Sequence, residues 1–119
     1  MDTATLLKSI RQISDEFSQN RPDRQRRRAL DRADFKALHN AGFTQVGLPS
    51  SAGGLWSDVH GSVRTICEAL RVLARSDSSV ALVSAMHPAV LSYWLTVPEQ
   101  ETEAIGWDAQ TEQIFQSIR

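Results

Sequence analysis

The chain has 119 residues, enough for one domain and too few for a second core of normal size. Hydrophobic residues make up 41% of it and charged residues 23%, the balance of an ordinary soluble globular domain. The formal net charge of −1 gives no reason to expect nucleic acid or an anionic membrane as partner. No apolar run reaches the ~20 residues that span a bilayer, and no signal-peptide pattern is present. The sequence predicts a cytoplasmic protein without a membrane partner.

The first predicted helix covers residues 3–19. Its apolar residues recur at three- and four-residue steps, at Leu6, Ile10, Ile13 and Phe17. Pro22 disfavours helix at the residue before it, so we expect this helix to end at about Asn20.

A second helix is predicted to begin near Asp31, whose side chain can accept backbone N–H bonds in the first turn. Gly42 suits the left-handed conformation that closes a helix, and Phe43 beyond it can fold back on Leu38. Residues 43–56 are expected to be irregular because Gly and Pro recur there, at Gly47, Pro49, Gly53 and Gly54.

A third helix is predicted over about residues 57–75. We expect one apolar stripe to face the core, made of Val59, Val63, Ile66, Leu70 and Leu73. Cys67 cannot form an internal disulfide because it is the only cysteine, and the sequence favours a buried small hydrophobe there over a reactive thiol.

The fourth helix, about residues 77–95, follows a tight turn capped by Ser76 or Asp77. It is apolar on every side, which is typical of a central, buried helix. Pro88 predicts a kink, or a break into two short helices near His87.

The remaining residues predict a turn at 97–99 and a last helix from about Asp108, a candidate N-cap. One face of that helix would hold Trp107, Thr111, Ile114 and Ile118. The predicted fold is a single all-α domain over residues 1–119, an antiparallel bundle of four to six short helices with a central apolar helix.

Motifs for independent chemistry are weak. The six arginines between Arg21 and Arg32 could contact phosphates, but interleaved aspartates and the lack of a stacking aromatic favour a solvated connector or helix end. Gly53-Gly54 lacks the Lys-Ser/Thr of a P-loop, the three histidines share no metal-ligand spacing, and no serine is marked as activated. We therefore predict no catalytic residue and no metal ligand.

His87 is the one polar side chain that invites two interpretations. It lies in the apolar helix directly before Pro88, where it could face a cavity. The alternative is a core histidine that bonds to a backbone carbonyl left free by Pro88.

Five short segments follow one another in the order found in acyl-CoA dehydrogenase N-terminal domains. They are Leu38-His-Asn-Ala-Gly-Phe43, Val46-Gly-Leu-Pro49, Gly53-Gly54, Glu68-Ala-Leu70 and Asp77-Ser-Ser-Val-Ala81. The chain resembles the N-terminal helical domain of that flavoenzyme superfamily. The resemblance covers about residues 1–119 and is strongest over 30–95.

The resemblance implies a wall of a substrate pocket, formed by the helix that matches residues 80–91. An apolar small-molecule substrate would lie nearest Leu82, Ala85, Met86 and His87. The resemblance implies FAD, with FMN as the alternative, held in the complete parent protein by a β-domain and a C-terminal bundle. These domains would also supply the catalytic base of an oxidoreductase acting on CH–CH bonds. No cofactor is expected for this chain alone, and the cofactor-binding residues are unknown.

The sequence departs from the family after residue 92, with Tyr93-Trp-Leu-Thr-Val-Pro-Glu-Gln-Glu in place of a Gly-Thr/Ser-x-x-Gln-Lys helix start. Flavin-dependent monooxygenases with the same domain plan are therefore an alternative parent. A stand-alone helical interaction module derived from the family is another. Since the chain stops at Arg119, we expect a fragment whose apolar faces are exposed and which binds the remaining flavin domains, a partner protein or itself.

Overall fold

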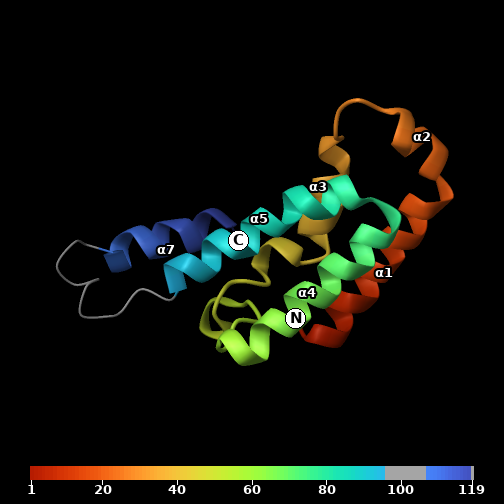
Figure 1. Cartoon of the computed structure of the whole chain (residues 1–119). Helices are drawn as coiled ribbons and strands as arrows, with labels where there is room; N and C mark the ends of the chain where they lie inside the picture. The colour runs from red at the N-terminus through yellow and green to blue at the C-terminus, as the bar shows by residue number, and fades with distance from the viewer. Residues whose placement is uncertain (96–106, 119) are drawn as a thin grey trace.

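The computed structural model describes residues 1–95 and 107–118, with side chains described for 1–93 and 109–118. This part of the chain is all-α, which confirms the predicted fold class. Its helices are α1 (Thr3–Gln19), α2 (Arg21–Arg26), α3 (Arg32–Asn40), α4 (Val59–Ser76), α5 (Ser78–Leu95) and α7 (Trp107–Ile118) (Figure 1). Two 3-10 turns, η1 (Phe43–Gln45) and η2 (Ser50–Ala52), lie between α3 and α4. The turn predicted at 97–99 lies outside the described residues.

An aspartate caps the start of four helices. The carboxylates of Asp2, Asp31 and Asp58 accept backbone N–H bonds at 2.7, 2.9 and 2.6 Å, and Asp77 accepts one from Val80 at 3.0 Å. Each bond satisfies a donor that has no partner inside its helix. The predicted caps at Asp31 and Asp77 are confirmed.

The core forms where α4 packs against both α1 and α5. The four apolar residues predicted for α1 are all buried there. The stripe predicted for α4 is wrong at its start, because Val59 and Val63 are exposed. The buried face of α4 instead comprises Ser62, Ile66, Ala69, Val72, Leu73 and Ser76.

Small polar residues form part of the buried face of α4. The buried hydroxyl of Ser14 on α1 donates to the carbonyl of Val72 at 2.9 Å and lies 2.9 Å from the hydroxyl of Ser76. A helix face can therefore be buried at serines when their hydroxyls find partners. Cys67 lies outside this face and is exposed, so its predicted burial is wrong.

Residues 42–58 connect α3 to α4 without regular structure, as predicted. Gly42 has φ 92°, the left-handed conformation that ends α3. Pro49 and Trp56 form an isolated bridge, and a side chain at Gly54 would collide with the carbonyl of Leu48. The close approach explains why a glycine is needed at that turn.

α5 differs from its prediction in burial. It is continuous from Ser78 to Leu95 with Pro88 inside it, so the helix does not break near His87. One side packs on the core through Val80, Ala81, Ser84 and Leu91, while the opposite side is exposed. The predicted central, fully buried helix is therefore wrong.

The last helix, α7, begins one residue before Asp108, so Asp108 is not its N-cap. The predicted face is half-buried at Thr111, Ile114 and Ile118, and Phe115 is buried beside it. Within the described ranges, no helix is both long and apolar enough to cross a membrane.

Candidate functional site

The outer face of α5 carries a row of exposed apolar side chains. We define it as Leu82, Met86, Val90 and Tyr93, whose exposed fractions are 74, 67, 55 and 65%. Their spacing of four, four and three residues places them along one side of the helix. Single exposed apolar residues are common on proteins, whereas an aligned row of large ones marks an interaction surface.

α5 also carries no Asp, Glu, Lys or Arg along its 18 residues. A helix that faces water on one side normally has charged residues there. Depletion of charge is characteristic of the centre of protein interfaces. The outer face therefore has the composition of a contact surface.

The structure places the four predicted substrate residues on different sides of α5. Leu82 and Met86 belong to the outer face. Ala85 lines a shallow pocket beside α4 with Trp56 and Val63. His87 lines a separate pocket toward α3 and η1. Among the described residues the four do not surround one cavity, and their contact with substrate stays a prediction.

His87 has a defined partner. Its Nε2 lies 2.7 Å from the backbone carbonyl of Thr44 in η1. Because a carbonyl only accepts, Nε2 carries the proton in this bond. The sequence predicts a bond from His87 to a backbone carbonyl freed by Pro88, which would lie within α5. The partner is the Thr44 carbonyl instead, so the predicted partner is wrong. The expected cavity beside His87 is present.

Two arginines of the predicted connector are partly buried in an ion-pair cluster. We call this the Arg24 cluster, and it comprises Arg24, Arg27, Asp34 and Asp77. Arg24 binds both carboxylate oxygens of Asp34, at 3.1 and 2.8 Å, and its Nε donates to Asp77 at 3.0 Å. Arg27 bridges the same two carboxylates at 2.5 and 3.4 Å.

The cluster links α2, α3 and the turn between α4 and α5, and it also contacts α1. The guanidinium carbon of Arg24 lies 3.5 Å from the ring centroid of Phe17 on α1, so the charge stacks on an aromatic face. Side-chain exposures of 12% for Arg24 and 9% for Asp34 contrast with 75% for Arg26. The solvated connector predicted from the sequence is therefore wrong for Arg24 and Arg27 and right for Arg26.

The carboxyl of Asp34 titrates below its ordinary range. Burial alone would raise its pKa, but hydrogen bonds and charge from Arg24 and Arg27 outweigh burial and lower the pKa. Burial likewise opposes the charged form of Arg24, and the bonds to Asp34 and Asp77 raise its pKa overall. Both pKa shifts favour the charged forms of Asp34 and Arg24.

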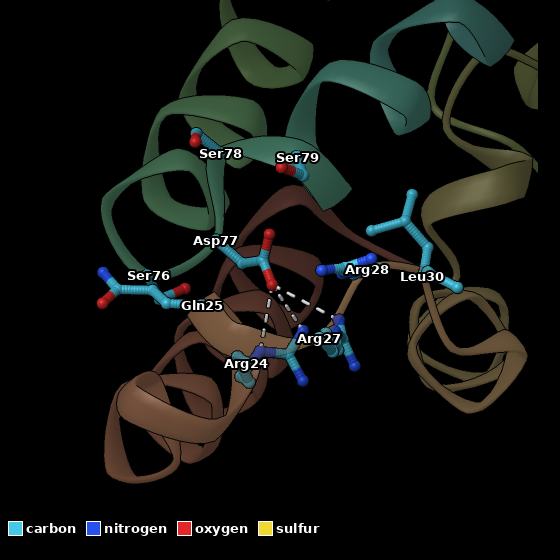
Figure 2. Close-up of a pocket in the computed structure, with 10 residues that line it drawn as sticks. Arg24, Gln25, Arg27, Arg28, Leu30, Ser76, Asp77, Ser78 and Ser79 are labelled. Atoms are coloured by element: carbon cyan, nitrogen blue, oxygen red, sulfur yellow. Dashed lines mark hydrogen bonds and ion pairs between the residues drawn. The ribbon is translucent and has the colours of Figure 1, made fainter.

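A pocket of about 410 Å³ lies beside the cluster, between the α2–α3 connector and the start of α5. Figure 2 shows Asp77 directed at Arg24 and Arg27. Arg28 and Leu30 also line the pocket. Asp77 already occupies the helix start that would attract an anion. The geometry therefore suits a structural clamp better than a phosphate site.

No known protein family, curated protein or solved structure matches this chain. The family resemblance accordingly depends on its sequence segments. Within the described residues, no group of three or more His, Cys, Asp or Glu could hold a metal ion.

Sequence reasoning missed the Arg24 cluster. A usable signal existed, since aspartates alternate with the arginines between residues 21 and 34. That pattern does not show which arginine turns inward, because Asp77 is distant in the sequence.

Proposed function

We propose that this chain is the N-terminal, substrate-pocket domain of an FAD-dependent oxidoreductase similar to acyl-CoA dehydrogenases. It is not catalytic on its own in this proposal, and the flavin and the catalytic base belong to other domains. The outer face of α5 packs against those domains and forms one wall of the pocket.

The observation that carries the proposal is the exposed, uncharged outer face of α5. Leu82 and Met86 do not stabilise the helix while they face water. Burying each side chain against a partner would contribute ~1.5–3 kcal/mol to the binding free energy. An apolar wall also suits an apolar substrate, because a polar group there would lose its hydration.

The family-like segments agree with the local structure. Gly42 follows α3 in the left-handed conformation, and Gly54 lies against the Leu48 carbonyl in the turn before α4. Asp77 caps the helix that carries the outer face. These features support the resemblance because each of its residues has a physical reason to be there.

A stand-alone helical interaction module is the second candidate. The same exposed face supports it, because any partner protein could cover Leu82 and Met86. The two functions differ in whether a flavin accompanies the native protein.

The deciding experiment isolates the native gene product under mild conditions and measures its mass and its flavin absorbance. We expect flavin near one per chain, and we expect Leu82→Asp to reduce flavin retention by placing a charge in the contact. Leu30→Asp is the matched control, since it makes the same exchange at an exposed leucine outside the outer face. A flavin-free native protein that binds a partner through α5 would support the interaction module instead.

A further inference from the structure

On the other side of α5 from the outer face lies a pocket of about 240 Å³, between α5 and the α3–η1 segment. Phe35 and Phe43 form its aromatic walls, Val83 lies at its rim, and Ser84 and His87 supply polar atoms. This pocket does not depend on the proposed function, because none of the outer-face residues lines it.

Ser84 is the unusual member. Its side chain is buried, with 6% of the residue exposed, and its hydroxyl has no hydrogen-bond partner within the described structure. A buried hydroxyl without a partner costs ~1–3 kcal/mol. Such a group persists more readily in a protein when a ligand satisfies it.

His87 provides a second polar group one helical turn away. In the tautomer whose Nε2 donates to the Thr44 carbonyl at 2.7 Å, Nδ1 can accept a hydrogen bond. Nδ1 has no partner among the described residues. Residues three apart on a helix are neighbours, so Ser84 and His87 can act on the same ligand atom.

These two atoms specify the ligand chemistry. A hydroxyl group accepts a hydrogen bond from Ser84 and donates one to His87 Nδ1, which an ether, a ketone or a hydrocarbon cannot do. No Asp, Glu, Lys or Arg lines the pocket, so an ionic ligand would lose its hydration without compensation. An apolar cavity of ~150 Å³ holds one benzene ring, so this pocket admits a single substituted ring.

We propose that the pocket between α3, η1 and α5 binds a small, uncharged alcohol or phenol, with its ring between Phe35 and Phe43 and its hydroxyl on Ser84 and His87. The test is a titration of the full chain with phenol and, separately, toluene, followed by NMR shifts of the residues lining the pocket. Toluene matches phenol in size but has a methyl group where phenol has its hydroxyl.

Phenol is expected to bind about fivefold or more tightly than toluene, the ratio given by one net hydrogen bond. Ser84→Ala is expected to reduce that preference, because the bond to His87 remains, while keeping toluene binding. The same variant should raise the stability of the chain, because it removes an unsatisfied hydroxyl from a helix.

Val83→Trp is expected to fill the pocket and block both probes. Val90→Trp, the same exchange at an exposed valine on the outer face, should block neither. Equal affinity for phenol and toluene, no binding of either, an undiminished preference in Ser84→Ala, or equal loss in the two tryptophan variants would overturn the proposal.

Discussion

α1 and α5 are nearly equal in length, with 17 and 18 residues, and each buries one side in the same core. Their outward sides differ. The exposed side of α1 is polar and charged, with Lys8, Arg11, Gln12, Asp15 and Glu16. The exposed side of α5 is apolar and uncharged.

The two helices therefore carry apolar residues for different reasons. On α1, Ile10 is apolar because it is buried within the chain. On α5, Met86 is apolar although two thirds of it faces water, so the packing of the described residues does not require it. We infer that a contact outside the described chain requires it.

The largest effect is expected at the Arg24 cluster, which contacts Phe17 of α1 and includes Asp77, the cap of α5. Arg24→Ala leaves Asp34 and Asp77 buried without their main partner, which should lower the free energy of unfolding by ~3–5 kcal/mol. Arg26→Ala, at an exposed ion pair, should change it by less than ~1 kcal/mol. Denaturant unfolding measures both, and equal effects would show that the cluster is not a clamp.

The buried and exposed faces should respond oppositely to truncation. Ile10→Ala on α1 should lower the free energy of unfolding by ~2–5 kcal/mol through lost burial and a cavity. Met86→Ala on the outer face should change it by ~0.5 kcal/mol or less. A large cost for Met86→Ala in chemical denaturation would mean that this chain itself covers the outer face.

Acid should weaken the Arg24 cluster. The pKa of Asp34 is lowered in the folded state, so its contribution is complete at neutral pH. It declines as pH falls through the ordinary carboxyl range near ~3.9 and is lost below the folded pKa, by about 1.4 kcal/mol for each unit of lowering. Unfolding measured against pH should show this slope, and Asp34→Asn should flatten it.

The smallest effect on stability, with a clear effect on assembly, is expected for Leu82→Asp. The isolated chain should self-associate through the outer face at high concentration, and the new charge should make it monomeric in sedimentation. Its free energy of unfolding should change by ~0.5 kcal/mol or less. If Leu82→Asp and Leu30→Asp sediment alike, another surface drives association.

Much of the fold could be predicted because it follows from local patterns. The periodicity of α1 and the cap at Asp31 depend on residues close in sequence. The Arg24 cluster could not be predicted in the same way, because the burial of Arg24 depends on Asp77, which is 53 residues away in the sequence. The composition of α5 likewise predicts burial without showing whether this chain or another surface supplies it.

The most direct test of the account measures whether the outer face is covered in the native source. In a Cys67→Ser background, Met86→Cys and Gln12→Cys place one thiol on the exposed side of α5 and of α1. Both thiols should react rapidly with a maleimide in the purified chain. In the native assembly, the account predicts that the thiol at position 86 is protected and the one at position 12 still reacts. Equal reactivity at both positions in the native assembly would contradict it.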